Sequence, residues 1–279
     1  MLRKIVFFIA EEKQICAIEQ MKRNFGQNGE MIVVSGAFEA GKETAYNKES
    51  TLFVTDEEEA LAALKRNGYY AIVLLHAGNK EQDLSGALYA ITDIEELTFD
   101  SFMLAYMRLA GEPWTILETE RCLVREMTVE DVEAFYEIYK EPSITYYMEE
   151  LFKEPEEERE YTREYIKKIY GFYGYGLWSI VSRGSGRVIG RAGISWREGF
   201  DIPELGFVIA VPYQHQGYAY EVCRAILEYG KEELQFDEVQ ALVQEGNEAS
   251  VKLCMRLGFV KKDILENKGK YYERYVVTL

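Results

Sequence analysis

Residues 204–220 read Glu204-Leu-Gly-Phe-Val-Ile-Ala-Val-Pro-Tyr-Gln-His-Gln-Gly-Tyr-Ala-Tyr220. The first half predicts an apolar strand, and the second half predicts a short turn that leads into a helix. A helix start offers unpaired backbone N–H groups and the positive end of the helix dipole, so it can bind a phosphate through the main chain alone. Gly217 lets a pyrophosphate approach closely, and the small Ala219 avoids crowding it. The same pattern also fits an ordinary strand-to-helix connection, and the flanking sequence has to decide between the two.

The composition indicates a soluble globular protein. With 279 residues, the chain is long enough for about two domains that each have their own core. The 48 Asp and Glu residues outnumber the 32 Lys and Arg residues, which gives a formal net charge of -16 and a pI near 4.8. Nucleic acid is therefore not an expected partner, because phosphate backbones require a basic face. A cationic or neutral substrate fits this charge better.

The cysteines and the apolar runs point to the cytoplasm. Cys16, Cys122, Cys223 and Cys254 are scattered, and the chain has only two histidines, so neither a metal site nor a disulfide framework is predicted. The apolar run at the N-terminus stops at Glu11, too early for a secretory signal, and no run is long enough for a membrane helix. We expect no membrane partner.

The first part of the chain alternates short apolar runs with amphipathic ones, the pattern of a small parallel α/β domain. We assign this domain to residues 1–115, because Gly111-Glu-Pro113-Trp114 breaks the preceding helix. The predicted strands are Ile5–Ile9, Met31–Val34, Leu52–Thr55, Ala71–Leu75 and Ala87–Ile91.

Part of this domain resembles the haloacid dehalogenase (HAD) fold. The resemblance is carried by Leu52-Phe-Val-Thr-Asp56, Ala60-x-x-Ala63-x-x-x-x-Gly68, Ala71-Ile-Val-Leu-Leu75 and Ala87-x-x-x-Ile91. Phosphatases of that family need a nucleophilic Asp-x-Asp after the first strand, where this chain has Ile9-Ala-Glu11. Isoleucine cannot act as a nucleophile, so we expect a non-catalytic domain. Asp56, which would match the family's metal-binding aspartate, is expected to cap the following helix.

A second motif, Gly36-Ala-Phe-Glu-Ala-Gly41-Lys42-Glu43, is close to a phosphate-binding P-loop. The P-loop requires Ser or Thr after the lysine, whereas Glu43 would place a carboxylate beside the phosphates. We interpret Lys42 as a loop lysine, and ATP-dependent activity is left as a minor alternative.

The second domain, residues 116–279, has a different order of elements. The pattern predicts a strand, two helices, three strands, a helix, a strand, a helix and closing strands. The predicted ranges include a single strand over 118–126, an acidic helix over 154–170, strands at 178–182, 188–196 and 204–210, a strand at 239–243, a helix at 247–257, and strands at 259–264 and 271–278.

Residues 118–279 resemble the GNAT N-acetyltransferase superfamily, and within it the branch that includes the ribosomal-protein alanine acetyltransferases. The motifs that carry the resemblance are Glu118-Thr-Glu-Arg-x-x-x-Arg125, Val188-Ile-Gly190, Glu204-Leu-Gly-Phe207, Gln214-x-x-Gly217-Tyr-Ala219 and Asn247-x-x-Ser250-x-x-Leu253-x-x-x-x-Gly258-Phe259. The resemblance implies a mixed, splayed central sheet flanked by helices. It also implies that acetyl-CoA serves as co-substrate and that its acetyl group passes directly to an amine.

The resemblance also assigns the residues that bind acetyl-CoA. The pantetheine arm would pair with the main chain of Phe207, Val208, Ile209 and Ala210. The pyrophosphate would be held by the amides of Gln214, His215, Gln216, Gly217, Tyr218, Ala219 and Tyr220. Asn247 and Ser250 would lie near the thiol end, and Asn247 is also expected to cap its helix. An exposed strand edge and a helix start suit these two parts of the cofactor.

The chemistry requires a neutral amine, so a base is needed at pH 7. Glu204 matches the family's usual glutamate and is the predicted general base; the alternative is a surface acid at a strand end. Many members of the family have a tyrosine acid where this chain has Cys254, which puts such an acid in doubt. A thiol pKa near 8.5 would allow the thiolate to leave unassisted.

The identity of the acceptor and the oligomeric state are not indicated by the sequence. Glu149, Glu150 and Glu156-Glu-Glu158 favour a cationic small molecule or peptide end, although solvated acidic helices explain them equally well. The alternative to an enzyme is a CoA-binding sensor or scaffold with little catalysis.

Overall fold

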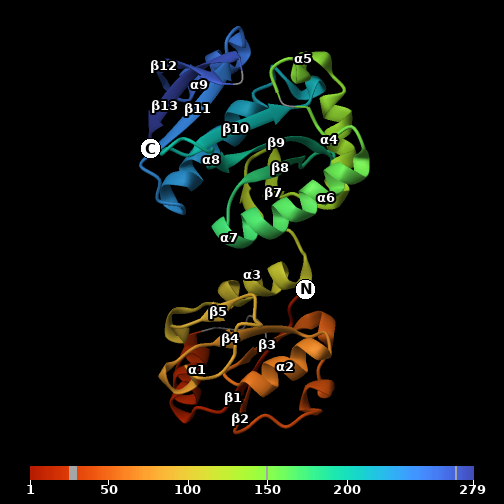
Figure 1. The fold of residues 1–279 in the computed structure, drawn as a ribbon, viewed down its shortest axis with the longest axis vertical. Coiled ribbons are helices and arrows are strands. Elements are labelled where there is room, and N and C mark those ends of the chain that lie inside the picture. Colours follow the sequence, from red (N-terminus) through yellow and green to blue (C-terminus); the bar gives the residue numbers. More distant parts are fainter. Residues whose placement is uncertain (25–29, 149, 268) are drawn as a thin grey trace. The chain divides into compact units, whose positions relative to one another are not determined.

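The computed structural model describes residues 1–24, 30–148, 150–267 and 269–279. They form two compact units, Met1–Trp114 (unit 1) and Thr115–Leu279 (unit 2). Unit 1 contains a five-stranded sheet and unit 2 an eight-stranded sheet, each covered by helices (Figure 1). The predicted α/β fold class, with a parallel sheet followed by a mixed sheet, is confirmed.

Unit 1 alternates strands and helices, and its sheet is parallel throughout in the order β2-β1-β3-β4-β5. Its elements are β1 (Lys4–Ile9), α1 (Glu12–Asn24), β2 (Glu30–Ser35), β3 (Thr51–Thr55), α2 (Glu58–Arg66), β4 (Tyr70–Leu74), β5 (Ala90–Ile91) and α3 (Phe99–Ala110), with short 3-10 turns between them. The last strand is shorter than the predicted Ala87–Ile91, because only two of its residues pair with β4.

Strand β1 is buried on both faces, as the centre of a doubly wound sheet requires. Ile5, Phe7 and Ile9 pack with side chains of α1 and α3 on one face. Val6 and Phe8 pack with side chains of α2 on the other face. The period of two along β1 therefore separates two hydrophobic layers.

Asp56 does not cap α2, which corrects the sequence-based expectation. Its carboxylate accepts hydrogen bonds from the backbone N–H groups of Ala10 (2.9 Å) and Glu11 (3.0 Å) and lies 3.1 Å from His76 Nε2. The N-cap position of α2 is Glu57. Asp56 is buried, and it ties the segment after β1 to the end of β3 at the sheet edge where a doubly wound fold would bind a ligand.

The structure predicts that Asp56→Ala destabilises unit 1 by about 2–4 kcal/mol, because two amide donors and an imidazole lose their acceptor. Urea unfolding of the full chain, followed by circular dichroism, measures this change. Asp93→Ala is the matched control, because Asp93 is exposed and makes no capping hydrogen bond. Equal unfolding midpoints for Asp56→Ala and Asp93→Ala would contradict the structural role of Asp56.

In the glycine-rich loop at residues 36–43, a carboxylate of the loop itself binds a backbone amide of the loop. The Glu43 carboxylate is buried and accepts from the N–H of Gly41 (2.8 Å) and from the Asn67 side chain (2.9 Å). Lys42 forms an ion pair with Glu39 at 3.1 Å. The amide that a phosphate would use is therefore occupied by a carboxylate, which agrees with the interpretation of Lys42 as a loop lysine.

Unit 2 is built on a sheet with the order β12-β13-β11-β10-β9-β8-β7-β6. Its strands are β6 (Thr115–Glu118), β7 (Cys122–Glu126), β8 (Leu177–Ser182), β9 (Val188–Ser195), β10 (Glu204–Ile209), β11 (Glu238–Gln244), β12 (Val260–Asn267) and β13 (Lys270–Thr278). Its helices are α4 (Val132–Tyr139), α5 (Pro142–Thr145), α6 (Pro155–Tyr165) continued by a π-helical turn (Ile166–Tyr170), α7 (Gly171–Tyr173), α8 (Tyr218–Glu232) and α9 (Glu248–Arg256).

The single strand predicted over 118–126 is wrong. Thr119 N–H donates to the Cys122 carbonyl (2.8 Å), and this turn folds the segment into the β6–β7 hairpin. The alternation of side chains continues across such a tight turn, so the sequence pattern alone did not reveal the break.

Helices α4 and α8 lie on opposite faces of the sheet. A Cβ added to Gly230 of α8 would meet Ile194 of β9, so Ile194 points toward α8. Arg191 has the opposite parity on β9, and its guanidinium lies 4.8 Å from the ring centroid of Phe135 in α4. Ser195 lies four residues after Arg191 on β9, so it faces α4 as well. The residues of β10 that pair with Arg191 and Ser195, Val208 and Glu204, lie on the same face.

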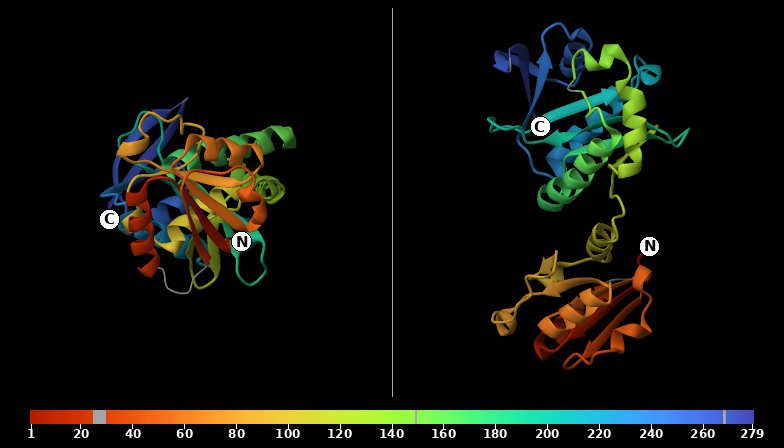
Figure 2. Two further views of the ribbon diagram at one scale, coloured as in Figure 1. Left: turned by 90° about the horizontal axis from the view of Figure 1, so that it is seen from below. Right: turned by 45° about the vertical axis from the view of Figure 1, so that its right-hand side comes forward.

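Strands β10 and β11 separate soon after they meet. They are parallel and paired only at Glu204↔Gln240, whereas β10 and β9 are paired over six positions. The right-hand view of Figure 2 shows β10 and β11 spreading apart, as Figure 1 does. Main-chain groups on the inner edge of β10 are thereby left without a strand to pair with.

Candidate functional site

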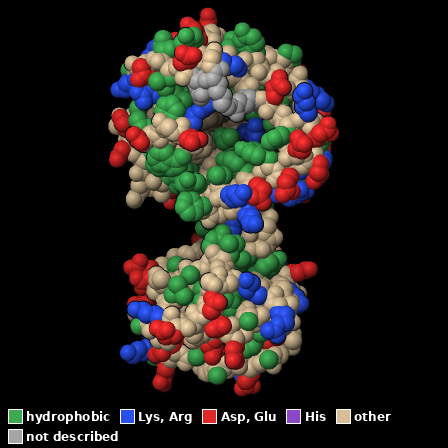
Figure 3. All heavy atoms as spheres, in the orientation of Figure 1, with side chains coloured by type: hydrophobic (Ala, Val, Ile, Leu, Met, Phe, Trp, Pro, Cys, Tyr) green, Lys and Arg blue, Asp and Glu red, His purple; other side chains and the backbone are tan. Residues whose placement is uncertain are grey.

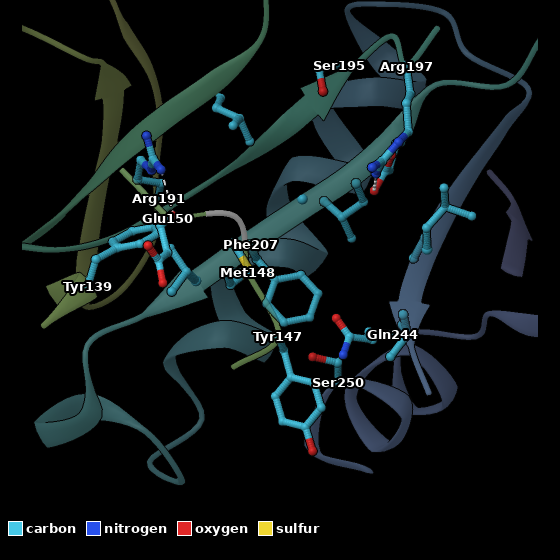
Figure 4. A pocket seen from close by; sticks show the side chains of 18 of the residues that line it. Tyr139, Tyr147, Met148, Glu150, Arg191, Ser195, Arg197, Phe207, Gln244 and Ser250 are labelled. Carbon is cyan, nitrogen blue, oxygen red and sulfur yellow. Dashed lines mark hydrogen bonds and ion pairs between the residues drawn. The ribbon is translucent and has the colours of Figure 1, made fainter. Parts of the chain in front are cut away.

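A cavity of about 890 Å³ lies against the diverging strands, and we call it the main cavity. It is lined by residues of β10 and β11, by the segment after α5, and by the start of α9. Figure 3 shows unit 2 hollowed on one face, with hydrophobic side chains along the hollow. In Figure 4, Ser195 and Arg197 lie at one end of the cavity, and Arg191 and Tyr139 lie at another.

Glu204 lies at the point where β10 and β11 part. It pairs with Ser195, so its side chain is on the α4 face and reaches the main cavity. Arg197 Nη1 contacts both carboxylate oxygens, at 3.0 and 3.1 Å. The side chain of Glu204 is 15% exposed. The arginine fixes the position of the carboxylate, which the sequence did not indicate.

Fewer main-chain groups of β10 face the gap between β10 and β11 than the sequence predicted. The N–H of Ala210 donates to the Ile189 carbonyl of the β9 side (2.8 Å). Alternate residues of a strand point their amides in opposite directions, so Val208 shares this orientation, and Phe207 and Ile209 face β11. The Ile209 carbonyl accepts from Gln214 Nε2 (2.8 Å). Val208 and Ala210 were assigned to the pantetheine arm, but their N–H groups point toward β9. Of the four residues, Phe207 therefore offers main-chain groups on the β11 side for the pantetheine arm.

The turn between β10 and α8 contains two residues with positive φ and leads into a helix start with unpaired N–H groups. His215 and Gly217 adopt left-handed conformations, with φ of 58° and 86°. The first intrahelical bond of α8 runs from Glu221 N–H to the Gly217 carbonyl (3.0 Å). The N–H groups of the three preceding residues, Tyr218, Ala219 and Tyr220, therefore have no carbonyl within the helix to bond. His215 lies in the turn, in agreement with its interpretation as a loop residue.

Gln216 contributes to the shape of this turn through its own hydrogen bond. Its side-chain Nε2 donates to the Pro212 carbonyl at 2.7 Å. Together with the bond from Gln214 to Ile209, this ties the turn back onto the end of β10. The side chains of both glutamines are therefore used to build the turn. The backbone N–H of Gln214 is used as well, because it donates to the Val211 carbonyl (3.1 Å).

Arg121 supports the same turn and was missed as a site residue. Its Nη1 donates to the Gln216 carbonyl (2.9 Å), its Nε donates to Glu221 (2.6 Å), and its guanidinium lies 4.1 Å from the ring centroid of Tyr218. Burial acts to raise the pKa of Glu221, but hydrogen bonds from Thr119 and Arg121 hold that pKa below its usual value. The Glu118-Thr-Glu-Arg motif was the signal in the sequence.

A second arginine flanks the start of α8. Arg256, in the last turn of α9, lies 4.0 Å from the ring centroid of Tyr220. Arg256 thus adds a cation beside a helix start whose dipole is also positive, whereas the charge of Arg121 is balanced by Glu221 in the first turn of α8.

Asn247 and Ser250 both line the main cavity. Asn247 Oδ1 accepts from the Ser250 N–H at 3.2 Å, which confirms the predicted N-cap of α9. The hydroxyl of Tyr147, which also lines the cavity, donates to the Gly246 carbonyl (2.9 Å). Figure 4 shows Tyr147, Gln244 and Ser250 gathered in this part of the cavity.

Cys254 is not placed to act as a general acid. It is fully buried in the core and is not among the residues that line the main cavity. Burial raises the pKa of its thiol to about 12. Cys254 therefore occupies the position of the family's tyrosine as a packing residue.

The acidic residues noted in the sequence have separate roles. Glu150 lines the main cavity, whereas Glu149 lies outside the described residues. Glu158 also lines the main cavity, where it is buried and accepts from the Phe152 N–H (3.1 Å). Glu156 pairs with Arg159 and Arg163 on the exposed face of α6. Only part of the acidic run can therefore meet a substrate.

The ranges that the structure describes contain neither a metal site nor a membrane-spanning helix. Within those ranges, no group of three His, Cys, Asp or Glu side chains is arranged to hold a metal ion. In the same part of the chain, no helix has the length and hydropathy needed to cross a membrane.

Known proteins resemble this chain in sequence and in fold. The family model described as "Acetyltransferase (GNAT) domain" matches residues 121–260. The uncharacterized protein YkkB of Bacillus subtilis is 31% identical over 147 residues, which cover 52% of this chain and 84% of that protein. The uncharacterized N-acetyltransferase YoaA of the same organism is 28% identical over 169 residues, 59% of this chain and 96% of its own. An acetyltransferase structure from Agrobacterium tumefaciens superimposes with a TM-score of 0.51 at 22% identity, covering 58% of this chain and 94% of its own.

Proposed function

The chain belongs to the GNAT acetyltransferase family and is an acetyltransferase, and on that premise we propose that unit 2 transfers an acetyl group directly from acetyl-CoA to a primary amine of a small molecule or peptide. The observation that carries this proposal is the separation of β10 and β11 beyond Glu204↔Gln240, with the main cavity against it.

The residues around this separation fit acetyl-CoA. The inner edge of β10 at Phe207 can pair with the amides of the pantetheine arm as a neighbouring strand would. The start of α8, with Gly217 in its left-handed conformation and Arg121 beside it, suits the pyrophosphate. Asn247 and Ser250, at the start of α9, lie where the thioester end would reach the main cavity. Bound acetyl-CoA supplies an acetyl group activated as a thioester.

Glu204 is the proposed general base. An amine with the pKa of lysine, about 10.4, must lose a proton before it can attack, which costs about 4–5 kcal/mol at pH 7. Glu204 reaches the main cavity and is oriented by Arg197, so it can accept that proton directly or through a water molecule. The departing thiolate needs no buried acid, since a thiol pKa near 8.5 makes it a fair leaving group.

A free-thiol assay with a panel of primary amines tests the proposal. We expect CoA release that depends on the acceptor, because direct transfer produces free thiol only when an amine attacks. Calorimetric binding of acetyl-CoA without thiol release from any amine would overturn the proposal and favour a CoA-binding sensor.

Unit 1 is proposed to be a non-catalytic, HAD-like domain. The position of the family's nucleophile is occupied by Ile9, and the oxygens of Asp56 are engaged with Ala10, Glu11 and His76. For the whole chain we propose a cytoplasmic location, where its four free cysteines would stay reduced.

A further inference from the structure

A second cavity, of about 560 Å³, adjoins the main cavity in unit 2. The two cavities share lining residues, among them Tyr161, Tyr165, Ser195 and Trp196, so they meet along a common wall. Ser195 pairs with Glu204 across β9 and β10. Ser195, which lines the second cavity, is therefore the strand partner of the proposed general base.

Five aromatic side chains line the second cavity: Tyr161, Tyr165, Tyr173, Tyr175 and Trp196. Several are strongly exposed for their type, at 48% for Tyr161, 44% for Tyr173 and 43% for Trp196. Large aromatic side chains gathered at one exposed site are typical of a binding surface. They come from three separate segments of the chain, so tertiary packing alone creates the group.

The five aromatic side chains contact one another and the backbone around them. Trp196 Nε1 donates to the Tyr175 hydroxyl (2.5 Å), and the Tyr165 hydroxyl accepts from the Leu177 N–H (2.8 Å). The rings of Tyr161 and Tyr165 are 6.2 Å apart and tilted by 47°, and those of Tyr173 and Tyr175 are 5.8 Å apart and tilted by 55°. Each ring also packs against an aromatic side chain outside this group, yet Tyr161, Tyr173 and Trp196 keep nearly half of their surface exposed.

The charges at this cavity cancel. Glu164 and Lys168 both line it, and their side chains pair with each other at 2.6 Å. Both come from the junction of α6 with the π-helical turn, and such turns occur often at functional sites. The charged side chains that line the second cavity thus offset each other, and its aromatic side chains can pack against an aromatic ring.

We propose that the second cavity binds the aromatic ring of the acceptor, so that the substrate is an arylalkylamine or a molecule that ends in one. This inference rests on the proposed function, because it takes the amine of that substrate to lie in the main cavity near Glu204. The ring stacks against the aromatic side chains, and Trp196, on the wall between the cavities, contacts it.

The test compares 2-phenylethylamine with n-hexylamine, two primary amines that differ in the ring. The wild-type chain is expected to show at least a tenfold higher kcat/KM for 2-phenylethylamine, mainly through a lower KM. Trp196→Ala should bring the ratio of the two kcat/KM values close to one, and Trp196→Phe should keep most of the preference. Tyr271→Ala is the control, because Tyr271 is 53% exposed and lines neither cavity.

Each outcome decides the inference separately from the proposed function. Equal use of both amines, an unchanged ratio in Trp196→Ala, or a preference for 1,6-diaminohexane would overturn the aromatic site while acetyl transfer stands. If no amine is acetylated, the proposed function fails, and calorimetry of 2-phenylethylamine with the CoA-bound chain decides the site. Binding that Trp196→Ala weakens tenfold or more would support it, and no binding would overturn it.

Discussion

Gly217→Glu is expected to abolish acetyl-CoA binding, with a loss of affinity of at least 100-fold. Gly217 has a φ of 86°, and any other residue there adopts a left-handed conformation at a cost of about 1–2 kcal/mol. A Cβ at this position would lie 3.4 Å from Arg121 Nη2, so the added side chain meets the arginine that supports the turn. The glutamate also places a negative charge where the pyrophosphate would lie. Isothermal calorimetry of acetyl-CoA with the full chain measures the loss.

Gly199→Glu is the matched control for this change. Gly199 lies between β9 and β10, has a φ of 87°, and has no atom within 4 Å of an added Cβ. It therefore carries the same backbone strain and the same new charge away from the start of α8. We expect Gly199→Glu to bind acetyl-CoA as the wild type does. Wild-type affinity in Gly217→Glu would remove this turn from the cofactor site.

Glu204→Gln is expected to lower kcat by about 10²- to 10⁴-fold, the usual contribution of a general base. The amide can still accept a hydrogen bond from Arg197, so the side chain should keep its place, but it cannot take a proton from an ammonium. Acetyl-CoA affinity should not change, because Glu204 lies at the opposite end of β10 from the α8 turn. Initial rates with saturating amine, together with calorimetry, separate the two effects.

The pH dependence gives a second measure of the same residue. As the pH rises toward the amine pKa of about 10.4, a larger fraction of the amine is already neutral, and the reaction depends less on a base. The difference between wild type and Glu204→Gln should therefore narrow from pH 7 to pH 9. Glu198→Gln is the control, since Glu198 is exposed and lines the same cavity. Wild-type turnover in Glu204→Gln would exclude Glu204 from the mechanism.

The sequence determined the features that depend on neighbours along the chain. Three of these features act within a few residues: the apolar strand before Gly217, the glycine at the start of α8, and the N-cap that Asn247 provides for α9. Backbone conformation and helix capping are local effects, so the residue types that they require can be recognised in the sequence without a structure. The layers of unit 1 followed from the same kind of periodicity.

Only the tertiary structure decided which distant groups meet. Asp56 has the sequence of a helix cap, yet amides 45 and 46 residues away compete for its carboxylate and bind it instead. Arg121 reaches Glu221 across 100 residues and thereby completes the α8 turn. The second cavity likewise needs β9 to bring Trp196 beside the tyrosines of α6 and its continuation. Such contacts depend on the order in which strands and helices pack, and no local pattern encodes them.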